Sequence, residues 1–306
     1  MRKILLPMLI LAAMSSCSKE NTGTPDAGGL KEVRLGSGIK SQTKAAYNGD
    51  VAVGGLQFLR KDAAAAPTDF SGCTALSGER AQGGAITFDE AQYYAASGNT
   101  YFASYFPAGS AGNDAVTWTV DGRTDIMTAD AVNAGSNAAP DASASLSYRH
   151  ELAQIEVVCK AAIDGGSVQA RWGEITGIKL LDTPTAMSYA YDGLAVTPGA
   201  EKGGIGLVNP NYTEDFAPLA VPASTNTAPN AAGMFVPSAS QRFQLEISTT
   251  IGGVKVITID LGAGESLKRS EKHIVTLTFQ ATQEQIGVSS SIETWTEGAA
   301  GSGSLD

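Results

Sequence analysis

Residues 242–249 read RFQLEIST and show the clearest alternation of apolar and polar side chains in the sequence. Phe243, Leu245 and Ile247 fall on one side of an extended segment, with polar side chains between them. This period of two predicts a β-strand with one buried face. Two glycines then turn the chain into a second apolar run at residues 254–261, so we expect a β-hairpin here.

Runs with the same period occur on both sides of this hairpin and are separated by turn residues. Only 17% of the residues are charged, and no long amphipathic helical pattern appears. This composition is typical of an all-β protein with many turns. Each inward aliphatic or aromatic side chain contributes roughly 1.5–3 kcal/mol when fully buried, so such strands can build a core without metal or disulfides. The other predicted strands cover residues 51–59, 85–88, 100–106, 115–120, 145–160, 175–181, 188–191, 216–221 and 273–279.

A small, polar stretch at residues 133–144 is the best internal boundary. It contains Pro140 and shows no apolar period. The 306 residues are long enough for two ordinary domains. We therefore predict two β-sandwich domains in tandem, an N-terminal one at residues 45–140 and a C-terminal one at residues 141–306.

The N-terminus has the features of a bacterial export signal. Two basic residues precede an apolar stretch of eleven residues, 4–14, which is too short to span a bilayer and is typical of a signal peptide. Ser15, Ser16 and Cys17 follow directly, and small residues before a cysteine resemble a lipobox. This pattern predicts a signal peptide at residues 1–16, cleavage before Cys17, and acylation of that cysteine.

Beyond the cysteine, residues 17–44 are expected to form a lipidated tether and a removable first strand. Val33, Leu35 and Ile39 fall on one side of an extended segment, with Ser37 in register. An exposed basic linker then separates this strand from the rest of the chain. A strand connected in this way can be cut off.

A further strand pattern lies near the C-terminus, before a Gly/Ser-rich tail. Ile286, Val288 and Ile292 alternate there with small residues. Two interpretations remain open. This strand is either the last strand of the second sandwich or a donor strand lent to another molecule.

Charge and cysteine content exclude several classes of protein. Loss of Arg2 and Lys3 with the signal peptide reduces the 21 basic residues to 19 against 31 acidic ones, a formal charge of −12, which disfavours nucleic-acid binding. No second apolar run approaches the roughly 18 residues of a transmembrane helix. Cys73 and Cys159 form one disulfide or are two buried hydrophobic residues, and the second interpretation is at least as well supported.

No catalytic, cofactor or metal-binding constellation is evident. His150 and His273 are the only histidines, each beside or within a predicted strand, and the ligand spacing of a zinc site is absent. Five aromatic residues could stack on sugars, although packing inside the protein is favoured. They are Tyr93, Tyr94, Trp172, Tyr189 and Tyr191.

Several motifs in a fixed order resemble the fimbrillin family, whose members are subunits of the protease-assembled type V pili of Gram-negative anaerobes. The resemblance extends over nearly the whole chain. It is carried by the lipobox, YFASYFP (101–107), DGRTDIM (121–127), YRHELAQIEV (148–157), MFVPSASQRFQLEIST (234–249) and IETWTEG (292–298).

This resemblance implies two transthyretin-like β-sandwich domains and export as a palmitate-bearing lipoprotein to the outer membrane and cell surface. It also implies that a trypsin-like protease cuts after a basic residue and removes the first strand. A strand from another subunit then fills the groove. The cut site maps best to Lys44, where many relatives carry arginine, with Lys40 as the second choice. An uncut subunit would stay bound to lipid and could serve as an anchor.

The leading hypothesis from the sequence is a structural, adhesive pilus subunit. Its expected partners are other subunits, the protease, outer-membrane lipid and a host protein or glycan. The alternative is a surface lipoprotein that binds glycan for a nutrient-uptake system, and an enzyme is least favoured. The role within the pilus, as shaft, tip or anchor, stays open.

Overall fold

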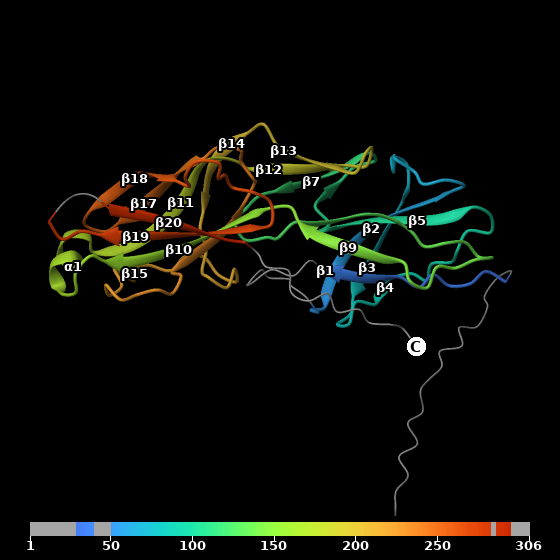
Figure 1. Cartoon of the computed structure of the whole chain (residues 1–306), viewed down its shortest axis with the longest axis horizontal. Helices are drawn as coiled ribbons and strands as arrows, with labels where there is room; N and C mark the ends of the chain where they lie inside the picture. Colours follow the sequence, from blue (N-terminus) through green and yellow to red (C-terminus); the bar gives the residue numbers. More distant parts are fainter. Residues whose placement is uncertain (1–28, 40–49, 283–285, 295–306) are drawn as a thin grey trace, which may run out of the picture.

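The computed structural model describes residues 29–39, 50–282 and 286–294, and these residues are almost entirely β-structure. Within them, one short helix occurs, α1 (Gly166–Trp172), and no helix is long and apolar enough to cross a membrane. The molecule is elongated, with β17 to β20 and α1 at one end and β1 to β5 at the other (Figure 1). The predicted all-β class is confirmed.

A seven-stranded sheet forms one end of the molecule. Its strands follow the order β1-β9-β8-β5-β2-β3-β4, and β1 is parallel to β9 while the other pairs are antiparallel. The strands are β1 (Gly36–Ile39), β2 (Val53–Ala63), β3 (Thr74–Arg80), β4 (Ile86–Phe88), β5 (Asn99–Phe106), β8 (Met127–Asn133) and β9 (Ser145–His150).

The two ends of this sheet meet, so the sheet closes on itself. An antiparallel bridge joins Gly36 to Ala85, immediately before β4. The amide of Ile86 donates to the carbonyl of Leu35 at 2.9 Å. The closed sheet surrounds an inner core whose members include Val33, Leu35, Ile39, Val53, Leu56, Phe58, Tyr94, Phe102, Phe106, Leu146 and Tyr148.

Strand β5, in the place of the strand predicted at 100–106, is buried on both faces and separates two cores. Phe102 and Phe106 point into the inner core. Tyr101, Ala103 and Tyr105 point the other way, into a larger core that continues to the far end of the molecule. The two faces of one aromatic-rich strand therefore connect both cores.

A four-stranded sheet covers the outer face of the closed sheet. Tyr105 of β5 packs against Trp118 and Tyr189 of this second sheet, with ring centroids 5.9 Å apart in both pairs. Its strands, in spatial order, are β13 (Ala195–Pro198), β12 (Ala186–Ala190), β7 (Ala115–Thr119) and β6 (Ser110–Ala111).

The sheets do not change at residue 140, where the sequence placed the domain boundary. Strand β9 follows that residue but pairs with β8 in the closed sheet, and β12 pairs with β7. The small, polar stretch at 133–144 is the connection between two antiparallel neighbours, which explains its lack of apolar period. The division into domains at 45–140 and 141–306 stays a prediction.

Two further sheets face each other at the other end and share the larger core. The predicted hairpin is confirmed as β17–β18, and Leu245 and Ile247 are fully buried. The predicted strand at 216–221 is reduced to the two residues of β15. One sheet is β16 (Ala231–Phe235), β10 (Ala153–Ala161), β19 (Glu271–Phe279) and β20 (Ile286–Thr294); the other is β14 (Lys202–Gly206), β11 (Glu174–Pro184), β17 (Arg242–Thr249) and β18 (Gly253–Asp260), with β15 (Leu219–Ala220) beside β11.

A buried polar cluster marks the point where the chain passes from β9 into β10. Nδ1 of His150 lies 2.5 Å from Oδ2 of Asp125, and both side chains are 1% exposed. The carboxylate of Glu151, fully buried, lies 3.0 Å from Nε of Arg149 and 3.0 Å from Nε of Arg269. These contacts tie the closed sheet to β19, because Arg269 lies just before that strand.

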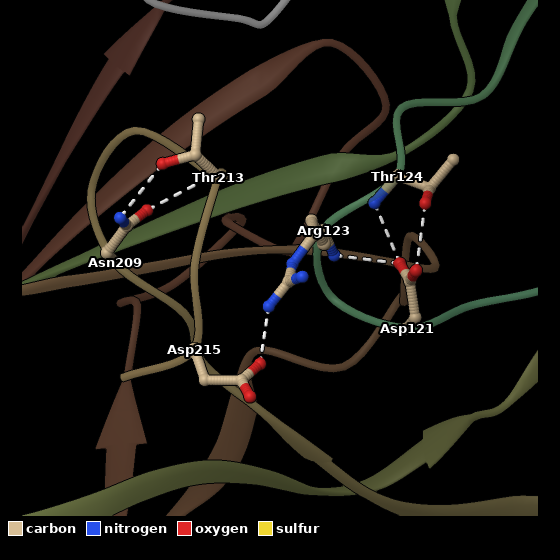
Figure 2. A network of polar contacts seen from close by, with 6 residues as sticks. All are labelled: Asp121, Arg123, Thr124, Asn209, Thr213 and Asp215. Atoms are coloured by element: carbon tan, nitrogen blue, oxygen red, sulfur yellow. Dashed lines mark hydrogen bonds and ion pairs between the residues drawn. The ribbon is translucent and has the colours of Figure 1, made fainter. Parts of the chain in front are cut away.

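A second polar network joins loops from the two halves of the chain (Figure 2). Oδ1 of Asp121 accepts hydrogen bonds from the amides of Arg123 at 2.8 Å and Thr124 at 2.7 Å. Arg123 then pairs with Asp215 across the gap between the loops. The neighbouring Gly122 is bridged to Met234 of β16, so two of the sequence motifs contact each other directly.

Candidate functional site

The strongest candidate site is the place occupied by residues 31–39 in the closed sheet. Val33, Leu35 and Ile39 are 7%, 3% and 7% exposed and belong to the inner core. Burial of three such side chains stabilises the fold by about 5–9 kcal/mol. That range is comparable to the whole net stability of an ordinary domain, about 5–15 kcal/mol.

Hydrogen bonds hold this segment along both edges. On one side β1 follows β9 in parallel, with Ser37 opposite Leu146 and Ile39 opposite Tyr148. On the other side the amide of Val33 donates to the carbonyl of Gln92 at 2.7 Å. The segment therefore fills a slot between two strand edges, and its removal would leave both edges unpaired.

One position in this slot is polar. The hydroxyl of Ser37 donates to the carbonyl of Gly84 at 2.8 Å. Gly84 has a φ of +92°, and a Cβ at this residue would overlap the carbonyl oxygen of Ser37. Only glycine allows this close approach of the two backbones.

The chain after the slot is held independently of the segment. Arg80 is 4% exposed and donates through Nη1 to the carbonyl of Val51. Its Nη2 lies 3.8 Å from Oδ1 of Asp50, which in turn accepts from the amide of Gly83. Burial lowers the pKa of Arg80, an effect opposed by Asp50. Residues 50 and 51 would thus stay attached to the body when the segment leaves.

Arg80 and Gly84 were not predicted from the sequence. A single arginine in a strand gives no sign that its guanidinium will be buried under a neighbouring loop. The Gly83-Gly84 pair predicts a turn but not its contact with Ser37. The predicted processing residues Cys17, Lys40 and Lys44 lie outside the described residues, so lipidation and cleavage stay predictions.

The C-terminal strand lies at the edge of its own sheet. β20 pairs antiparallel with β19, from Ile286 opposite Phe279 to Thr294 opposite Glu271. Ile286 is buried, but Val288 is 39% exposed and lies outside the core cluster. The side chain of Ile292 lies outside the described part. Among the side chains of β20 that the structure describes, only Ile286 is buried, so this edge strand is thinly packed there. Its donation to another molecule stays a prediction.

Most of the other candidate groups lie inside the protein. Cys73, which is half-buried, and Cys159, which is buried, are both free, and burial raises the pKa of the Cys159 thiol to about 12. Both histidines are fully buried, and burial lowers the pKa of His273 to about 4. Within the described ranges no cluster of His, Cys, Asp and Glu could hold a metal ion. Of the five aromatic candidates, Tyr94, Trp172, Tyr189 and Tyr191 are buried, which agrees with packing rather than sugar stacking.

A cavity of about 390 Å³ lies between β11, β14 and β17. Its lining includes the buried Leu180 and Leu267 and the exposed Lys202 and Arg242. Both cations already have partners, since Lys202 pairs with Asp182 at 3.3 Å and Arg242 with an aspartate of β18. The cavity therefore presents no free charge that would select a ligand.

Comparison with known proteins extends over most of the chain. The model of the family described as fimbrillin-like matches residues 58–295. No curated protein matches the sequence.

Among solved structures, a proposed cell adhesion protein from Bacteroides uniformis superimposes with a TM-score of 0.58 at 18% identity, covering 87% of this chain and 98% of that chain. Another from Bacteroides ovatus has a TM-score of 0.56 at 11% identity, with the same coverage of both chains. A third, from Parabacteroides distasonis, has a TM-score of 0.51 at 11% identity and covers 88% of this chain and 98% of that chain. At these identities the likeness shows a common fold.

Proposed function

The chain belongs to the fimbrillin-like family, and from this premise we propose that it is a structural subunit of a cell-surface fimbria, without enzymatic activity. It is exported as a lipoprotein and assembles when its first segment is replaced by a strand from another subunit. The observation that carries this proposal is the slot: residues 31–39 complete a closed sheet and are held by both edges, yet belong to the N-terminal end of the chain.

The energetics of the slot give a reason for assembly. A subunit without the segment loses the burial of Val33, Leu35 and Ile39 and exposes two strand edges. Such an edge recruits another strand, with backbone hydrogen bonds giving affinity and side-chain pockets giving specificity. The opened subunit is therefore unstable alone and is stabilised by a partner.

The position of the proposed cut fits this scheme. Lys44, with Lys40 as the second choice, lies between the segment and Val51, which Arg80 holds. A trypsin-like protease cutting there would remove the segment together with the acylated Cys17 and its outer-membrane anchor. The remaining body would keep its contacts at residues 50 and 51.

Limited trypsin treatment of the purified precursor tests the proposal. We expect cleavage near Lys44, release of the N-terminal peptide and conversion of monomers into oligomers on size-exclusion chromatography. The control is a disulfide lock, Gly38→Cys with Ser147→Cys in a Cys73→Ser background. These two exposed residues are opposite each other in the β1–β9 register, and a Cβ at Gly38 meets open space. The locked chain should be cut but stay monomeric until it is reduced.

Replacing Ile286, Val288 and Ile292 together by Asp tests the donor strand. The variant should lose stability at the buried Ile286 but remain folded, because Val288 is exposed at the sheet edge, and it should no longer oligomerise after cleavage. Oligomers from the locked chain, or a stable monomer after release of the peptide, would contradict strand replacement. Unfolding of the triple variant would show that β20 belongs to the core of its own subunit.

The glycan-binding alternative has little support from the geometry. A sugar platform needs exposed aromatic rings, and four of the five candidate rings are buried. We therefore keep a single proposed function.

A further inference from the structure

We infer that the C-terminal strand of one subunit enters the slot of the next in a single register and direction. Ile286, Val288, Ser290 and Ile292 take the places of Val33, Leu35, Ser37 and Ile39, and the donor runs in the same direction as β1. This inference rests on the proposed function and specifies the partner that the slot selects.

The first observation is a repeated sequence pattern. Residues 33–39 read VRLGSGI and residues 286–292 read IGVSSSI. Both place two aliphatic residues, a serine and an isoleucine at alternate positions, in that order. Because alternate residues of a strand share one face, each segment presents the same four-residue face.

The second observation is that the slot is apolar at three positions and polar at one. Val33, Leu35 and Ile39 contact the inner core, whereas Ser37 donates to the carbonyl of Gly84. In the same direction, Ser290 reaches that carbonyl. In the opposite direction, Ser290 would occupy the place of Leu35, and Val288 would face the carbonyl of Gly84. A hydroxyl buried without a partner is unfavourable, so the pattern selects one direction.

The third observation is how this face of β20 packs within its own subunit. Ile286, Val288 and Ser290 lie opposite Phe279, Leu277 and Val275, which are all buried. Nevertheless Val288 is 39% exposed and Ser290 is exposed. The Ser290 hydroxyl donates to the carbonyl of Asp260 at 3.1 Å, so it already bonds a backbone carbonyl as Ser37 does.

The small residues on the other face of the donor also fit. In this register Ser289 and Ser291 replace Gly36 and Gly38. A Cβ at Gly36 would lie 3.5 Å from Oγ of Ser145, an ordinary contact, and a Cβ at Gly38 meets open space. Neither glycine has a positive φ, so serine adopts the same backbone without strain.

Disulfide crosslinks between engineered cysteines report directly the register of the donor strand against β9. The same-direction register places Ser291 opposite Ser147, as Gly38 is now. The opposite direction would place Gly287 there, and a shift by two residues would place Ser289 there. We would therefore combine Ser147→Cys with Ser291→Cys, Gly287→Cys or Ser289→Cys in a Cys73→Ser background. Parallel neighbours lie close enough for a disulfide.

After trypsin cleavage, assembly and mild oxidation, a ladder of crosslinked subunits on a non-reducing gel is expected with Ser291→Cys. At least tenfold less crosslinking is expected with the other two partners. A stronger ladder with Gly287→Cys or Ser289→Cys overturns the inferred direction or register. Oligomers that crosslink in no arm overturn the register while leaving strand replacement standing, whereas a cleaved chain that never oligomerises overturns both proposals.

The polar position has its own test. Ser290→Ala should weaken oligomer formation about fivefold, the value of one net hydrogen bond of roughly 1 kcal/mol. Ser291→Ala is the matched control, because its side chain faces away from Gly84 in this register. Equal behaviour of the two variants would overturn the pairing of Ser290 with Gly84.

Discussion

At the scale of single residues, Asp121 organises the loop between β7 and β8, which contacts the second half of the chain through Arg123 and Gly122. Partial desolvation would raise the pKa of its carboxyl, but the amides of Thr124 and Arg123 and the Thr124 hydroxyl outweigh this effect. The pKa of Asp121 is therefore lowered, which means that the folded state favours the ionised form. The contribution to stability is present above the ordinary carboxyl range and is lost as the pH falls through the folded pKa.

Replacing Asp121 by Asn should thus lower the free energy of unfolding at pH 7 by about 0.5–1 kcal/mol, a small effect because the side chain is exposed. Denaturant unfolding at pH 7, 4 and 2 should show the difference from the unmodified chain closing below pH 3.8. Asp114→Asn, another exposed aspartate, is the control. A difference that persists unchanged to pH 2 would contradict the role of the charge.

At the same scale, the sequence predicted apolar side chains better than polar ones. The inward positions of β17 followed from periodicity alone. The buried pair of His150 and Asp125 did not, because 25 residues separate them and only the folded chain brings them together. Polar contacts depend on loops whose paths the sequence does not reveal.

At the scale of elements, the segment at residues 31–39 is packed more tightly than the last strand, β20. Leu35 is 3% exposed within the inner core, whereas Val288 is 39% exposed at a sheet edge. Leu35→Ala should therefore cost about 2–4 kcal/mol of unfolding free energy in the uncut chain, and Val288→Ala at most about 1 kcal/mol. Chemical denaturation of both variants measures this contrast. Similar losses of unfolding free energy in the two variants would show that β20 is packed as tightly as the first segment.

Strand positions were predictable, but strand partners were not. Turn residues and alternation located β2, β5, β7, β10, β17, β18 and β19. The parallel pairs β1–β9 and β10–β19 join segments far apart in the sequence, and the pairing of β12 with β7 crosses the expected domain boundary. Periodicity reports which face of a strand is buried, and it carries no information on which strand lies alongside.

At the scale of the whole molecule, the two predicted processing events have separable outcomes. Cys17→Ala should prevent incorporation of labelled fatty acid and leave the signal peptide on the precursor, because the lipobox cysteine is the acylated residue. In the unmodified protein, N-terminal sequencing of the surface form should begin at Ala45, after Lys44. A surface form that keeps its acylated Cys17 would favour an anchor or a receptor over an exchanged subunit.

The closed sheet has a consequence for how assembly is timed. While the chain is intact, residues 31–39 are joined to Val51 through a short connection, so their local concentration at the slot is on the order of millimolar. A donor strand from another subunit therefore competes poorly for the slot with the covalently attached segment, even when both bind with equal affinity. A cut between residues 31–39 and Val51 turns the segment into a separate peptide, which can dissociate and be diluted. Proteolysis would then trigger assembly by lowering the local concentration of the first segment at the slot. The donor strand need not bind more tightly than the strand that it displaces.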